Sequence, residues 1–142
     1  MIGLEGAQTI VGSALAYARA NGFPPMTVAV LDPGGQLVSF AREDGSSLLR
    51  EKIARGKARS ALNLGVGTRA LVARAHSHAA FINAVTMLAS GELIPVPGGV
   101  LVRDSNASVL LGAVGVSGHR PDEDEACALS GIHAAGLVAE TG

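Results

Sequence analysis

The most constraining feature of the sequence is the stretch from Met26 to Asp44, which has the pattern of a β-hairpin. Apolar side chains alternate with their neighbours on either side of an Asp32-Pro33-Gly34-Gly35 break, and a period of two places successive side chains on opposite faces of a sheet. Pro33 suits the first central position of a turn, and glycine accepts the positive φ that reverses a strand. Both faces carry apolar residues, so we expect a central hairpin covered on both sides.

Composition narrows the class of protein. A chain of 142 residues is expected to form one domain spanning residues 1–142. The net charge of −1 gives no support for a nucleic-acid or anionic-membrane partner, so neither is predicted. Hydrophobic residues make up 48% of the chain and charged residues only 16%, which favours a homo-oligomer because a small monomer must cover its surface with polar groups.

The cellular setting is predicted to be the cytoplasm. The first residues do not form a basic segment followed by an apolar core, so no secretory signal is expected. No run of the sequence approaches the ~20 apolar residues of a membrane span. Cys127 is the only cysteine, which excludes an internal disulfide and suits a buried small side chain better than a nucleophile.

A helix is predicted before the hairpin, over Leu4 to Ala20, and a second one after it, from about Leu48 to Leu64 with Ser46 or Ser47 as its cap. Lys57 is the anomaly of this second helix, since it lies one turn from Ile53 and one turn from Ala61, inside the apolar stripe. Either its stem covers apolar surface while the ammonium reaches water or a carboxylate, or it faces a ligand.

The next predicted helix follows Thr68 and is broken near residues 75–77. His76 and His78 within it point about 160° apart on a helix and cannot chelate one metal together, so no metal site is predicted. Strands are then expected over residues 100–103 and 109–117. The Gly98-Gly99 pair before them forms either a plain tight turn or a backbone cradle for an anion.

The last predicted helix runs from Pro121 to Val138 and opens with four acidic residues, Asp122 to Glu125. Such residues stabilise the positive end of a helix dipole, although Asp124 or Glu125 could instead order Lys57 or contact a substrate. His133 is expected at the edge of the core, whereas His119, in the preceding loop, is free to reach a pocket mouth.

The order of elements is helix, two strands, two or three helices, two or three strands, helix. This grouping favours an α+β fold, with an antiparallel sheet of about five strands packed with helices, in a profilin-like or PAS-like arrangement.

Five segments in this order, AVLDPGGQLVSFARED, IARGKARSAL, LIPVPGGVLV, LLGAVGVSG and PDEDEACA, resemble the GlcG/HbpS family of haem-degrading proteins. The resemblance covers roughly residues 5 to 138. It implies a profilin-like α+β fold, assembly into dimers and larger homo-oligomers and, in some members, binding of haem or a related tetrapyrrole. It assigns a haem axial ligand to no residue of this chain.

Two functions with pocket chemistry follow for this sequence, besides an assembly or regulatory role that the hydrophobic composition suggests. The first is binding of a small ligand, with haem as the candidate cofactor, whose carboxylates meet Arg42, Lys57 or the Gly98-Gly99 amides, with Asp44 beside Arg42 in the wall of the site. The alternative is a cofactor-independent lyase, isomerase or hydratase acting on a small carboxylate or carbonyl compound. In that enzyme Lys57 is the anchor or base, and Glu125 or His119 moves protons.

Overall fold

The computed structural model describes residues 1–142 and contains five helices and five strands. In chain order these are α1 (Leu4–Ala20), β1 (Thr27–Leu31), β2 (Leu37–Arg42), α2 (Arg50–Leu64), α3 (Arg69–Ser77), α4 (Ala79–Leu88), β3 (Gly99–Arg103), β4 (Leu110–Ser117), α5 (Pro121–Ala134) and β5 (Val138–Glu140). The strands form one antiparallel sheet in the order β2-β1-β4-β3-β5. The predicted α+β class is therefore confirmed.

The hairpin forms as predicted, but its two strands have different surroundings. All five residues of β1 are buried, whereas β2 is an edge strand whose residues are exposed or half-buried. The expectation of a hairpin covered on both sides is thus wrong for β2, because α2 covers β1, β4 and β3 and does not extend over β2. In the turn, the Asp32 side chain accepts the N–H groups of Gly34 and Gln36.

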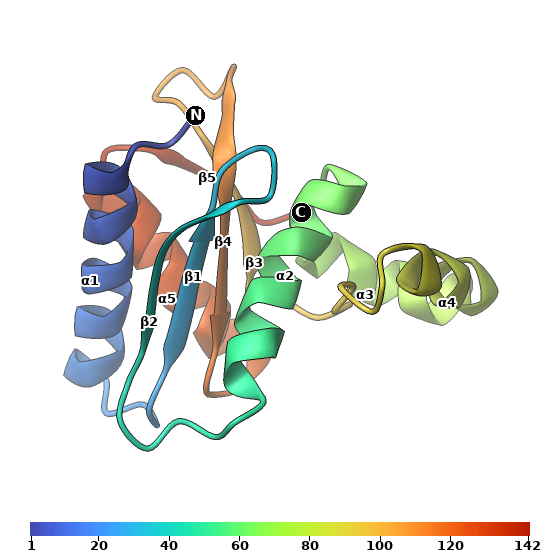
Figure 1. Cartoon of the computed structure of the whole chain (residues 1–142), viewed down its shortest axis with the longest axis horizontal. Coiled ribbons are helices and arrows are strands. Elements are labelled where there is room, and N and C mark those ends of the chain that lie inside the picture. The colour runs from blue at the N-terminus through green and yellow to red at the C-terminus, as the bar shows by residue number, and fades with distance from the viewer.

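The sheet lies between two unequal helical layers (Figure 1). Helices α1 and α5 pack against each other and against one face, where the largest hydrophobic cluster lies. Helix α2 lies alone on the other face. That second interface is thin and built of small residues, with Ala58 and Ala61 packed on Leu31, Leu101 and Ala113.

Helix α2 approaches the sheet closely because β4 has no side chain at Gly115. A Cβ atom at this position would overlap the backbone carbonyl of Ala54. Residues of α2 that face the sheet are therefore held nearly against the strand backbone. A long side chain on this face, such as Lys57, has room only toward the end of the sheet.

Helices α3 and α4 project from the body as an arm (Figure 1). The break predicted near residues 75–77 is present, since α3 ends at Ser77 and α4 begins at Ala79. A small cluster of Leu71, Ile82 and Leu93 holds the arm together. None of the helices is long and apolar enough to cross a membrane.

The C-terminal helix is shorter than predicted. It ends at Ala134 instead of Val138, and Gly136, with φ +73°, turns the chain back toward the sheet. Val138–Glu140 then forms β5, an unpredicted edge strand paired with β3. A three-residue strand is too short to show a periodic pattern, so local sequence favoured continuation of the helix.

Candidate functional site

Lys57 lies in a buried ion pair at the end of the sheet. Its Nζ is 2.9 Å from Oδ2 of Asp124 and donates to the Val116 carbonyl at 3.0 Å. The side chains of Lys57 and Asp124 are 3% and 1% exposed. The ammonium group therefore meets a carboxylate inside the protein and does not reach water.

The partner carboxylate is held from a second side. Oδ1 of Asp124 accepts the backbone N–H of His119 at 2.8 Å. Burial lowers the pKa of Lys57 and raises the pKa of Asp124, and in each case the attraction between the two groups offsets only part of that shift. Hydrogen bonds therefore hold this ion pair together in surroundings that disfavour both charges.

The Gly98-Gly99 turn is shaped around this lysine. Gly98 has φ +118°, and a Cβ atom there would lie 2.7 Å from Nζ of Lys57. The N–H of Gly99 donates to Oγ1 of Thr68 at 2.8 Å. These contacts give the two glycines a packing role next to α2, and the Gly99 amide already has a partner within the chain.

Glu125 takes part in a second ion pair beside the first. Its carboxylate receives two hydrogen bonds from Nε of Arg69 and one from Nη2, and Arg69 also contacts Asp122 at 2.7 Å. The His119 ring is half-buried against Phe23, with ring centroids 5.0 Å apart. The fold thus brings five of the predicted site residues to one end of β4 and α5: Lys57, Gly98, Gly99, Glu125 and His119. Each of them already contacts other residues of the chain there.

The other two predicted ligand contacts lie elsewhere. Arg42 and Asp44 line a polar hollow at the end of the hairpin together with Arg19, Pro25 and Glu43. Nη2 of Arg42 donates to the Ser46 carbonyl at 3.0 Å. The structure does not unite these two residues with Lys57 in one pocket.

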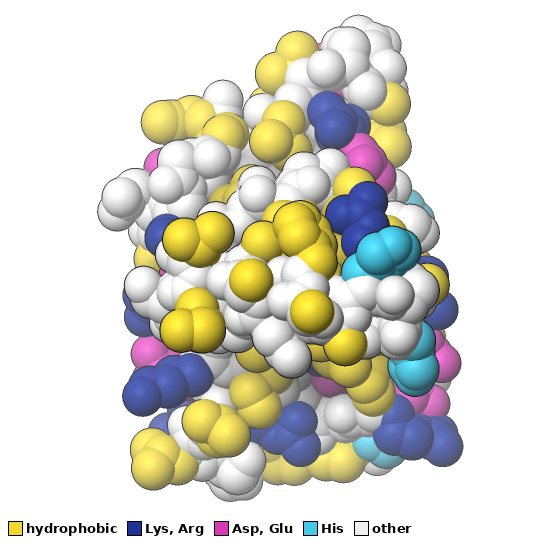
Figure 2. All heavy atoms as spheres, turned by 90° about the vertical axis from the view of Figure 1, so that its right-hand side faces the viewer, with side chains coloured by type: hydrophobic (Ala, Val, Ile, Leu, Met, Phe, Trp, Pro, Cys, Tyr) yellow, Lys and Arg dark blue, Asp and Glu magenta, His cyan; other side chains and the backbone are white.

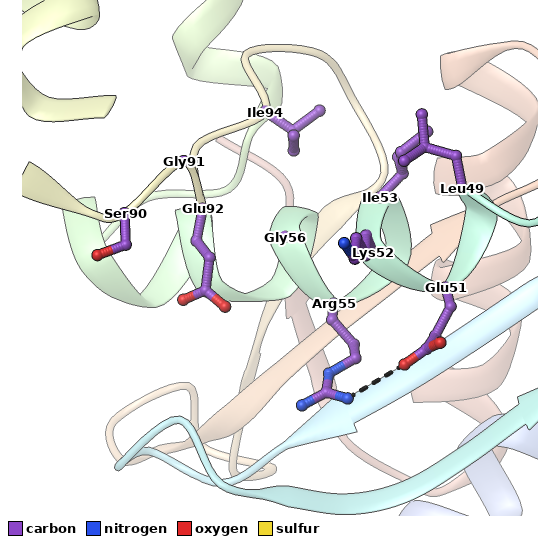
Figure 3. A pocket seen from close by; sticks show the side chains of 10 residues that line it. All are labelled: Leu49, Glu51, Lys52, Ile53, Arg55, Gly56, Ser90, Gly91, Glu92 and Ile94. Carbon is purple, nitrogen blue, oxygen red and sulfur yellow. Dashed lines mark hydrogen bonds and ion pairs between the residues drawn. The ribbon is translucent and has the colours of Figure 1, made fainter. Parts of the chain in front are cut away.

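The largest hollow was missed by sequence reasoning. It has a volume of about 560 Å³ and lies between the first turns of α2 and the segment 90–94, which follows α4 (Figure 3). Leu49, Ile53 and Ile94 supply its apolar wall. Lys52 and Arg55 lie on the flank of α2 that faces away from the sheet, and only the return of segment 90–94 makes that flank the wall of a cavity.

The charges around this α2 hollow are mostly paired. Arg55 contacts Glu51 at 3.3 Å, and Glu92 contacts Arg59 at 2.9 Å. Lys52 is the one charged residue of the lining without an ion-pair partner. The hollow therefore combines an aliphatic wall with one available positive charge, a combination that suits an apolar body bearing a carboxylate.

The histidines do not form a metal site. No group of three His, Cys, Asp or Glu side chains is placed to hold a metal ion. His76 and His78 are exposed at the junction of α3 and α4. His133, expected at the edge of the core, is exposed on α5 because it points away from the packed face that holds Ile132.

Comparison with known proteins agrees with this architecture. The family model described as "Haem degrading protein HbpS-like" matches residues 2–133. The chain belongs to the HbpS-like family. No curated protein sequence matches the chain.

Solved structures of similar fold include members of this family. Protein ORFY of Klebsiella pneumoniae is 25% identical, with a TM-score of 0.85 over 94% of this chain and 90% of that one. HbpS is 27% identical, with a TM-score of 0.75 over 92% and 86%. PduOC, solved as a haem complex, shares the fold at 19% identity, with a TM-score of 0.84 over 96% of both chains.

Proposed function

We propose that this HbpS-like protein binds a tetrapyrrole, or an organic acid of similar size and polarity, in the α2 hollow. The observation that carries the proposal is the combination of an aliphatic wall with the unpaired Lys52 in a cavity of about 560 Å³, a size within the usual range of small-molecule sites. Similarity in fold to PduOC, which was solved with haem, supports this ligand class.

The parts of the hollow have distinct roles in this proposal. Ile53 and Ile94 face each other across the cavity and would contact the flat face of a macrocycle (Figure 3). Lys52 would pair with a carboxylate at the rim. Leu49 is 60% exposed, so a ligand at this place would also cover apolar surface that now faces water.

The enzyme alternative receives less support from the geometry. A lyase, isomerase or hydratase would need the amine of Lys57 to reach a substrate, with Glu125 or His119 nearby as a proton carrier. The amine is enclosed by Asp124 and the Val116 carbonyl, and Lys57 lines none of the principal cavities. We therefore assign Lys57 a structural role and place the ligand on the other flank of α2.

Hemin titration followed by Soret absorbance tests this function. The blocking variant is Leu49→Asp, which puts a charge into the apolar wall at the start of α2, where the helix dipole favours a carboxylate, so the helix should not be weakened. The matched control is Leu48→Asp, since Leu48 is exposed and does not line the hollow. We expect saturable binding by the native protein and Leu48→Asp, and at least about 10-fold weaker binding by Leu49→Asp. No saturation with native protein, or equal binding by both variants, would refute the site.

We also propose that the protein is a homo-oligomer and that the arm contributes to its interface. Phe81, Met87 and Leu88 on α4 are 55%, 83% and 85% exposed, and Figure 2 shows hydrophobic side chains gathered on the end of the molecule that carries the arm. Apolar surface of this kind marks contact sites. Light scattering of the native protein and of Leu88→Glu measures whether a charge at this position lowers the mass.

A further inference from the structure

We propose that the α2 hollow recognises the carboxylate and the hydrocarbon body of its ligand and supplies no bond to a metal, so that metal-free protoporphyrin IX binds as tightly as haem. This inference rests on the proposed function and specifies how that site recognises its ligand. It follows from the side chains that surround the cavity.

The lining holds none of the usual ligands of haem iron. These are His, Cys, Met and Tyr side chains, and the ten lining residues include none of the four types. The histidines lie elsewhere: His76 and His78 at the α3–α4 junction, His133 on α5 and His119 against Phe23. The residues present thus fit the organic part of haem and do not fit its iron.

Lys52 is the residue left to select the ligand. It belongs to the first turn of α2, between Glu51 and Ile53, where the helix dipole disfavours a positive charge. It has no carboxylate partner in the chain, unlike Arg55, which pairs with Glu51. Lys52 forms no ion pair within the chain, whereas a ligand carboxylate in the hollow would give it one.

The two contributions to binding are then both independent of the metal. Contact with Leu49, Ile53 and Ile94 depends on the apolar area covered. The ion pair with Lys52 depends on the carboxylate, which haem and protoporphyrin IX share. We therefore expect the two dissociation constants to agree within about 3-fold, since no iron bond adds to either.

The experiment is a parallel titration of the full chain with hemin, followed by absorbance, and with protoporphyrin IX, followed by fluorescence. Lys52→Ala should weaken both ligands by a similar factor, about 3- to 5-fold for the loss of one partly exposed ion pair. Lys52→Arg should restore most of that loss. The matched control is Arg74→Ala, because Arg74 is an exposed cation on α3 without an ion pair and outside the hollow.

The outcomes separate this inference from the function on which it rests. Saturable binding of hemin with at least about 10-fold weaker binding of protoporphyrin IX, or a low-spin six-coordinate hemin spectrum, would overturn the inference and leave the binding function standing. Unchanged affinity in Lys52→Ala would also overturn it. Failure of both ligands to bind would overturn the function itself. Equal binding, a high-spin hemin spectrum and a matched loss in Lys52→Ala would support the inference.

Discussion

Breaking the Lys57–Asp124 pair should reveal how strongly the fold depends on it. Both side chains are almost fully buried, and their charged atoms are 2.9 Å apart. Removal of one partner leaves the other charge buried without compensation, which typically costs about 3–5 kcal/mol of unfolding free energy. We predict losses of this size at pH 7 for Asp124→Asn and for Lys57→Met.

The two single variants should respond to pH in opposite directions. Without Asp124, the pKa of Lys57 falls further below 10.5, because the attraction of the Asp124 carboxylate for the ammonium group is gone. Between the lowered folded value and 10.5 the unfolded state binds more protons, so the stability of Asp124→Asn rises as pH rises. Without Lys57, the pKa of Asp124 rises further above 3.8. Between 3.8 and this raised folded value, the folded state binds more protons than the unfolded state. The stability of Lys57→Met therefore rises as pH falls.

Urea unfolding between pH 4 and pH 10 measures both effects, with a maximum slope of about 1.4 kcal/mol for each pH unit within the respective window. The double variant Lys57→Met/Asp124→Asn leaves neither charge buried, so it should be less destabilised than the sum of the two single changes. Arg120→Met is the control, because Arg120 pairs with Glu123 at the surface and such pairs contribute about 0–1 kcal/mol. Losses below about 1 kcal/mol, or slopes of the same sign in the two single variants, would refute the buried pair.

Three other predictions test packing, reactivity and assembly. Gly115→Ala should destabilise the protein by about 3 kcal/mol or more, since its Cβ would overlap the Ala54 carbonyl. The control Gly12→Ala, in open space on α1, should stabilise the protein by about 0.5–1 kcal/mol. Thermal unfolding measures both variants, and a tolerated Gly115→Ala would contradict the close approach of α2. The Cys127 thiol, whose pKa burial raises to about 12, should resist alkylation at pH 8 until the protein is unfolded, and rapid native alkylation by mass spectrometry would contradict its burial. Leu88→Glu should lower the mass measured by light scattering if α4 lies in an interface, and an unchanged oligomer would exclude that surface.

The candidate site illustrates the limits of sequence reasoning. Helical periodicity identified Lys57 as an anomaly in an apolar stripe, and one of the stated alternatives was a stem buried toward a carboxylate. The structure shows this arrangement, with Asp124 as the carboxylate. The sequence left Asp124 and Glu125 as the acids that could order Lys57, and no local pattern could choose between them, because the choice depends on how α5 rotates against β4. The α2 hollow was missed for a similar reason, since Lys52 and Ile94 are far apart in sequence.

The α+β class, the hairpin, the break between α3 and α4 and the family could all be predicted from the amino-acid sequence, because periodicity, turn residues and motif order are local properties of the chain. Three features emerge only from the folded chain: β2 lies at an edge of the sheet, α5 ends early so that β5 can form, and Lys57 is held in an internal ion pair. The position of the α2 hollow also depends on the fold. These features depend on contacts between segments distant in sequence, where steric fit and burial of charge outweigh local preference.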